Sequence, residues 1–223
     1  MKKSVVNYKE FSFSKLNTPE FSHLKYLFGW VVYFSLYFLT ENLIPSKNCH
    51  LIYSPLDDMI PFLEIFVIPY VLWYGLIVYS LTYFARYNID SFKRLQCFIM
   101  ITQAVAIIIY IIYPSKQELR PTEFENKNIL TDIIGFLYTF DTNTGVFPSL
   151  HVAYSIGIAS VWLKQKDVFW FKRIFIAVFC LLVCISTVFI KQHSILDVFG
   201  AIPVCVLAEI LVYKKYWLKK IKR

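Results

Sequence analysis

Charged residues are scarce in this 223-residue chain: Asp, Glu, Lys and Arg make up 17% of it, whereas 57% of the residues are hydrophobic. Such an apolar share exceeds that of an ordinary soluble domain. Charge is absent from long stretches, so the apolar residues form runs instead of the stripe of a core-facing helix. A helix needs roughly 20 apolar residues to cross hydrocarbon about 30 Å thick. Several runs meet that length, which argues against a soluble protein and predicts a helical membrane protein.

Leader, redox and metal patterns are also missing. Residues 1–25 are polar and lack the apolar core of a secretory signal. The five cysteines have neither metal-site nor redox-motif spacing, and we interpret them as small apolar residues. No cluster of Asp and His residues predicts a metal site, so we expect neither a metal nor another cofactor.

What the chain does contain is a series of six apolar runs. They cover residues 26–44, 60–84, 95–113, 147–163, 171–190 and 195–217. Residues 114–145 form the longest polar stretch between them. We therefore predict an all-α protein, a six-span transmembrane helical bundle that forms a catalytic domain over residues 26–217. The segment 1–25 and the basic tail 218–223 are both expected to be cytoplasmic.

The positions of Lys and Arg predict the orientation of the bundle. With six spans and both termini on the cytoplasmic side, eighteen of the 23 basic residues fall in cytoplasmic segments, as the positive-inside rule requires. This placement explains the net charge of +8 without a nucleic-acid partner. Asp57 and Asp58 fall in an outer loop, where we expect them to be solvated. The outer segments hold five basic residues: Lys47, Lys116, Arg120, Lys127 and Lys191.

Two histidines fall at outer ends of predicted spans. His151 lies at the start of the fourth span and His193 just before the sixth, so both face the same side of the membrane. Lys116, Arg120 and Lys191 lie beside span ends on that side. Imidazoles and cations at helix ends suit an anionic ligand, because a helix N-terminus adds unpaired N–H groups and a partial positive charge.

Asp197 follows His193 by four residues, so the two side chains share one face of a helix. A carboxylate there fixes the tautomer of the imidazole and leaves its other nitrogen as a nucleophile or base. A purely structural hydrogen bond is the competing interpretation.

Two motifs around these residues resemble the type 2 phosphatidic acid phosphatase superfamily. Pro148-Ser149-Leu150-His151 is similar to the family's Pro-Ser-Gly-His motif. Ser186, His193 and Asp197 have the spacing of its Ser-Arg-x5-His-x3-Asp motif. The resemblance covers roughly residues 114–200. It is strongest to the branch that includes inositol phosphorylceramide synthases and related bacterial proteins.

The chain also resembles a third motif of this family, but it differs from the family pattern at several positions. Lys116 and Arg120-Pro121 resemble the family's Lys-x6-Arg-Pro, with three intervening residues instead of six. Leu150 replaces the family's glycine, and Thr187 replaces its arginine. Lys191 shares a helical face with Thr187 and is a candidate to restore that charge, although without the bidentate fork of arginine. Snorkelling to the interface is the alternative role for Lys191.

The resemblance implies a mechanism. His193 attacks phosphorus to give a phosphohistidine, Asp197 orients His193, and His151 protonates the leaving oxygen as general acid. The two imidazoles and the Arg120 guanidinium are then expected to meet in one pocket. The side chains implied in phosphate binding are Arg120, Lys116, Ser149, Lys191 and Ser186.

We therefore expect an integral-membrane lipid phosphate phosphatase that acts at the extracytoplasmic face. The short, lysine-rich chain is typical of a multi-pass protein of a bacterial plasma membrane. Its expected partners are the bilayer and a lipid phosphate of the polyprenyl diphosphate, phosphatidic acid or phosphatidylglycerophosphate class. Two alternatives stay open: a lipid phosphotransferase that moves a phospho-headgroup to an alcohol, and a non-catalytic lipid-binding or transport protein.

Overall fold

The structure, a computed structural model, describes residues 4–221, without the side chains of residues 140 and 215–221. Eight α-helices occur in that part of the chain, so the all-α class is confirmed. The longer helices are α1 (Phe28–Leu43), α3 (Val67–Tyr87), α4 (Ile89–Ile112), α6 (Leu150–Leu163), α7 (Trp170–Phe189) and α8 (Ile195–Ile221). The smaller elements are α2 (Pro55–Met59), α5 (Ile129–Phe140), β1 (His50–Leu51) and β2 (Ser115–Lys116). Short 3-10 segments are η1 (Tyr8–Glu10), η2 (Phe13–Lys15), η3 (Ser22–Leu27), η4 (Ser46–Asn48) and η5 (Glu64–Phe66).

Among the residues that the structure describes, four helices are long and apolar enough to cross a membrane: η5 with α3, α4, α7 and the first 20 residues of α8. This indicates a multi-pass membrane protein. With 16 and 14 residues, α1 and α6 are shorter than a full crossing requires. The first two residues of the predicted run 26–44 belong to η3, and residues 147–149 of the run 147–163 precede α6. A six-span topology stays a prediction.

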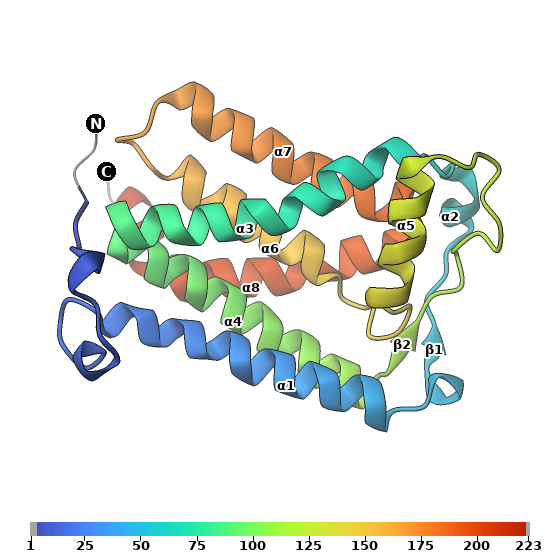
Figure 1. Cartoon of the computed structure of the whole chain (residues 1–223), viewed down its shortest axis with the longest axis horizontal. Helices are drawn as coiled ribbons and strands as arrows, with labels where there is room; N and C mark the ends of the chain where they lie inside the picture. The colour runs from blue at the N-terminus through green and yellow to red at the C-terminus, as the bar shows by residue number, and fades with distance from the viewer. Residues whose placement is uncertain (1–3, 222–223) are drawn as a thin grey trace.

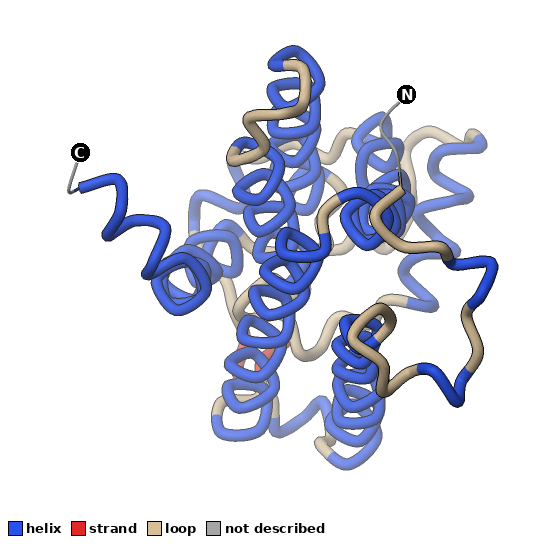
Figure 2. Tube along the Cα trace, turned by 90° about the vertical axis from the view of Figure 1, so that its left-hand side faces the viewer, coloured by secondary structure: helices blue, strands red, loops and turns tan. Residues whose placement is uncertain are grey.

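The six longer helices run side by side along the long axis of the molecule (Figure 1). Both chain ends lie at one end of this bundle, together with the α3–α4 and α6–α7 connections. At the other end lie α2, α5, β1 and β2 (Figure 1). Figure 2 looks at the bundle from the end that carries the termini. Lys2, Lys3, Lys222 and Arg223, which belong to the predicted cytoplasmic segments, lie outside the described residues.

α4 and α6 form the centre of the bundle. α4 packs against α1, α3, α6 and α8, and α6 packs also against α7 and α8. At the contact of α4 with α6, a Cβ atom on Gly157 would lie 2.5 Å from the ring of Phe98, so glycine permits the close approach. The outward side chains of α7, such as Phe175 and Leu181, are apolar and exposed, as on a lipid-facing surface.

The stretch 114–145, expected to be polar, contains an unpredicted helix. α5 starts at the N-cap Asn128, whose side chain accepts two backbone N–H groups of the first turn. Buried Ile134 and Leu137 belong to a small core cluster that also contains Tyr70 of α3. α5 thus crosses the end of the bundle (Figure 1) and leads the chain back toward the start of α6.

Candidate active site

The predicted histidines are positioned by the N-terminal ends of α6 and α8. Ser149 is the N-cap of α6 and accepts a backbone N–H in the first turn, which places His151 in that turn. His193 precedes α8, and its amide donates to the carbonyl of Thr187 at 3.0 Å. The Ser149 amide donates to the Asp197 carbonyl at 3.1 Å. The two helix starts are therefore tied directly to each other.

The side chains of Asp197, His193 and His151 form a row. His193 Nδ1 lies 3.1 Å from Asp197 Oδ2, which confirms the contact predicted from the four-residue spacing. The Ser194 amide donates to the same oxygen at 2.9 Å and holds the fully buried carboxylate in place. His193 Nε2 lies 3.4 Å from His151 Nδ1. With its proton on Nδ1, His193 directs the lone pair of Nε2 toward His151.

Asp141 completes the surroundings of His151 and was not singled out in the sequence. Its Oδ2 lies 3.8 Å from His151 Nε2 and accepts hydrogen bonds from the Tyr70 hydroxyl and, at 3.0 Å, from Gln192 Nε2. The rings of Tyr70 and Trp73 lie against the imidazole, with centroids 4.6 and 4.3 Å away. These contacts fix the imidazole plane and place a negative charge beside it. In the sequence, Asp141 is a single acid within a polar stretch, so no pattern there indicates that it lies beside His151.

A second acid, Asp57, corrects the expectation of a solvated loop. Its side chain is 2% exposed and accepts hydrogen bonds from the Ser194 hydroxyl at 2.6 Å and the Ile195 amide at 2.8 Å. It also accepts the Ser54 amide at 2.8 Å as part of a capping box in α2. Asp57 therefore caps the start of α8 and fixes α2 beside His193. Asp58 is exposed and accepts a hydrogen bond from Tyr53, in agreement with the expected loop.

Arg120 lies behind the row of side chains and not in it. Its guanidinium donates to the carbonyls of Tyr138 at 2.9 Å and Asp141 at 2.5 Å, and it lies over the ring of Tyr138. Burial lowers the pKa of this guanidinium, and the Asp141 carboxylate opposes that shift. The guanidinium lies there because the last carbonyls of α5 have no donors within the helix. The expected meeting of two imidazoles and this guanidinium in one pocket is seen only for the imidazoles.

The other predicted phosphate ligands have partners elsewhere. Lys116 forms an ion pair with Glu118 at 2.6 Å. Lys191 has a left-handed backbone, φ 56°, and its ammonium donates to the carbonyls of Asp57 and Ile60 at the end of α2.

Ser149 and Ser186 are also turned to the backbone. The Ser149 hydroxyl caps α6, and the Ser186 hydroxyl donates to the Val183 carbonyl at 2.6 Å. None of the five predicted phosphate ligands borders the groove described next. Their direct contact with phosphate stays a prediction.

The histidines lie at one end of a groove between α1 and α3, which we call the histidine groove; its volume is about 660 Å³. Exposed apolar side chains border it, including Phe34, Phe38 and Val78, so it opens toward the expected position of the lipid. Of the described side chains that line it, none is Lys or Arg, whereas Glu41 and Asp141 are acidic. Its members are Trp30, Tyr33, Phe34, Tyr37, Phe38, Glu41, Trp73, Tyr74, Ile77, Val78, Tyr110, Asp141, Thr142, Thr144, Gly145, Val146, Leu150, His151, Tyr154, Gln192 and His193.

Within residues 4–221, no group of three or more His, Cys, Asp or Glu side chains has the geometry of a metal site. The site brings together two imidazoles and two carboxylates, Asp197 beside His193 and Asp141 beside His151. No family model, curated protein or solved structure matches this chain.

Proposed function

We propose that this chain is an integral-membrane lipid phosphate phosphatase that acts through a phosphohistidine formed on His193. The observation that carries the proposal is the row Asp197–His193–His151, with spacings of 3.1 and 3.4 Å, at the polar end of an apolar groove. The carboxylate fixes the tautomer of one imidazole, and the second imidazole lies next to it, from where it reaches a reacting oxygen once it turns away from His193. The aromatic walls of the groove suit an acyl or prenyl chain.

The reaction proceeds in two displacement steps. His193 Nε2 attacks phosphorus, the bond from phosphorus to the lipid oxygen breaks, and protonated His151 gives its proton to that oxygen. Neutral His151 then removes a proton from water as the water oxygen attacks the phosphohistidine. Inorganic phosphate leaves, and His193 is restored. Asp141, 3.8 Å from His151 Nε2, stabilises the imidazolium form on which the first step depends.

The spacing of the imidazoles sets a condition for substrate binding. The 3.4 Å between His193 Nε2 and His151 Nδ1 leaves no room for a phosphorus atom and a leaving oxygen between them. His151 must therefore turn away as the substrate enters.

Transfer of a phospho-headgroup to an alcohol is a second candidate, and one observation favours it. The described lining of the histidine groove has two carboxylates and no cationic side chain. A phosphate monoester carries more negative charge than a diester, so two carboxylates repel it more strongly. A diester substrate with an alcohol acceptor in place of water suits this charge distribution better.

Turnover by the purified protein tests both candidates. The detergent-solubilised chain is incubated with lipid phosphate monoesters and diesters in the presence of a chelator, with and without an alcohol acceptor. We expect turnover that His193→Ala abolishes and that His50→Ala, a matched substitution of a histidine stacked on Tyr113, leaves unchanged. Release of inorganic phosphate without acceptor identifies the phosphatase, and strict dependence on acceptor identifies the transferase. Undiminished turnover in His193→Ala would exclude the proposed nucleophile.

The orientation is tested with a native cysteine. Cys49 lies between α1 and β1 at the same end of the bundle as the histidines. We expect a membrane-impermeant maleimide to label Cys49 from outside intact cells, and Cys49→Ser to remove that label. Burial raises the pKa of this thiol, so the reaction needs a mildly alkaline buffer. Labelling of Cys49 only after lysis would reverse the proposed orientation.

A further inference from the structure

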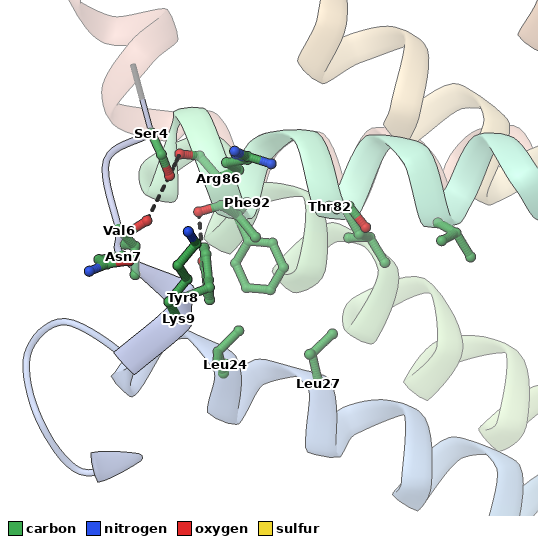
Figure 3. Close-up of a pocket in the computed structure, with 13 residues that line it drawn as sticks. Ser4, Val6, Asn7, Tyr8, Lys9, Leu24, Leu27, Thr82, Arg86 and Phe92 are labelled. Carbon is green, nitrogen blue, oxygen red and sulfur yellow. Dashed lines mark hydrogen bonds between the residues drawn. The ribbon is translucent and has the colours of Figure 1, made fainter. Parts of the chain in front are cut away.

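A second cavity lies beside the N-terminal segment; we call it the inner pocket (Figure 3). Val78 of α3 lines both this cavity and the histidine groove. Its volume is about 670 Å³. Leu24 and Leu27 border it on one side, and Thr82 of α3 and Phe92 of α4 on the other (Figure 3). The full lining is Ser4, Val6, Asn7, Tyr8, Lys9, Leu24, Leu27, Val78, Leu81, Thr82, Ala85, Arg86 and Phe92.

Two hydrogen bonds hold the N-terminal segment against the end of α3, beside this pocket. The Val5 amide donates to the Arg86 carbonyl at 2.9 Å, and the Tyr8 hydroxyl donates to the Ala85 carbonyl at 2.8 Å. Both acceptors belong to the last turn of α3, where helix carbonyls lack partners within the helix. Burial raises the pKa of Tyr8 to about 12, so its hydroxyl keeps the proton that it donates. These two hydrogen bonds hold the N-terminal segment in place as one wall of the pocket.

The two cavities have opposite charges at their polar ends. Lys9 and Arg86 border the inner pocket and are exposed, and none of its described lining residues is acidic. Glu10 and Glu20 lie outside this lining and accept hydrogen bonds from Asn7, and their carboxylates offset part of the positive charge of Lys9 and Arg86. An apolar interior beside two cations fits an amphiphile with a negatively charged head.

We propose that the inner pocket binds a phospholipid with an anionic headgroup, taken from the leaflet on the side of the chain termini. Its headgroup lies at Lys9 and Arg86, and one acyl chain packs against Leu24, Leu27 and Leu81. Val78 lines both cavities, so the end of this chain reaches the tail end of the histidine groove. The site is separate from the reacting groups and requires no turnover.

Retention of lipid by the full-length protein tests the proposal. The protein is reconstituted in nanodiscs of phosphatidylglycerol and phosphatidylcholine, extracted in mild detergent and examined by native mass spectrometry for bound lipid. We expect preferential retention of phosphatidylglycerol. The double variant Lys9→Gln/Arg86→Gln should retain it about thirtyfold more weakly, since each cation near an anionic surface contributes about 1 kcal/mol. The matched double variant Lys15→Gln/Lys25→Gln, which removes equal charge outside the pocket, should behave as the unmodified chain does.

A second substitution tests the apolar part without changing charge. Thr82→Trp fills the pocket and should abolish retention, whereas Leu72→Trp, at an exposed position of the same helix outside both cavities, should not. Thermal unfolding of each variant separates loss of lipid from loss of fold. Equal retention of the two lipids, or full retention by Lys9→Gln/Arg86→Gln, overturns the proposal. Displacement of the lipid by inorganic phosphate alone would identify a small-anion site instead.

Discussion

Replacing Asp141 with asparagine removes the negative charge beside His151 while it keeps an oxygen that accepts from Tyr70. At 3.8 Å the carboxylate stabilises an imidazolium by roughly 4 kcal/mol if the effective dielectric constant is about 20. The Asp141 side chain is 23% exposed, and solvent reduces this to about 1–3 kcal/mol. Loss of that amount lowers the rate of any step that needs His151 protonated by roughly fivefold to 150-fold.

The assay compares kcat/KM for two substrates of the Asp141→Asn protein. A lipid phosphate with an alkoxide leaving group needs the proton from His151, whereas an aryl phosphate does not, so the loss is expected only for the first. His151→Ala should show the same pattern, and the double variant should lose little more than His151→Ala alone. Asp132→Asn, on the exposed face of α5, is the control. Equal losses for both substrates, or faster turnover in Asp141→Asn, would refute the assigned role.

Three further substitutions have defined outcomes. Gly200→Ala should destabilise the fold by about 1–3 kcal/mol in thermal or denaturant unfolding, because its Cβ would lie 2.3 Å from the ring of Phe147; Gly75→Ala, with nothing within 4 Å, should be neutral or stabilising. Asp57→Asn should lower the midpoint of thermal unfolding and cost about 1.5–3 kcal/mol, since it weakens charged hydrogen bonds at the start of α8; an unchanged midpoint contradicts the capping role. Val78→Trp should raise KM roughly tenfold for a long-chain lipid phosphate and leave that of a short-chain analogue unchanged, since it shortens the space for the tail; equal KM changes would argue against the groove as the tail site.

The helical bundle could be predicted because long apolar runs and clusters of Lys and Arg can be recognised in a single sequence. α7 lies where the run 171–190 predicted it, whereas α4 overlaps the run 95–113 but begins six residues earlier, at Ile89. α5 was missed because 114–145 was judged by its mean polarity, although Asn128 opens a capping box with Thr131 before an apolar run. α3 begins seven residues after the start of the predicted run 60–84, because η5 precedes it, whereas α1 begins only two residues after the start of the run 26–44, where η3 precedes it.

Some contacts of the candidate site could be predicted from short sequence spacings, whereas others depend on how the helices pack. The contact between His193 and Asp197 was predicted from their four-residue spacing, although His193 lies two residues before α8 and the contact forms across the start of that helix. The position of Asp141 depends on how α5 crosses the end of the bundle, which no local pattern contains. The contacts of the cations also depend on tertiary structure. The predicted topology places Arg120 and Lys191 on the same side of the membrane as the histidines, and in the structure they donate to carbonyls at the ends of α5 and α2.

The central claim is that His193 becomes covalently bonded to phosphorus. A rapid-quench experiment with a lipid substrate radiolabelled in its phosphate, followed by peptide mapping, measures this directly. We expect a label that is stable in alkali, lost in acid, located on the peptide with His193 and absent from His193→Ala. Turnover in a protein that never acquires label, or label on another residue, would contradict the account.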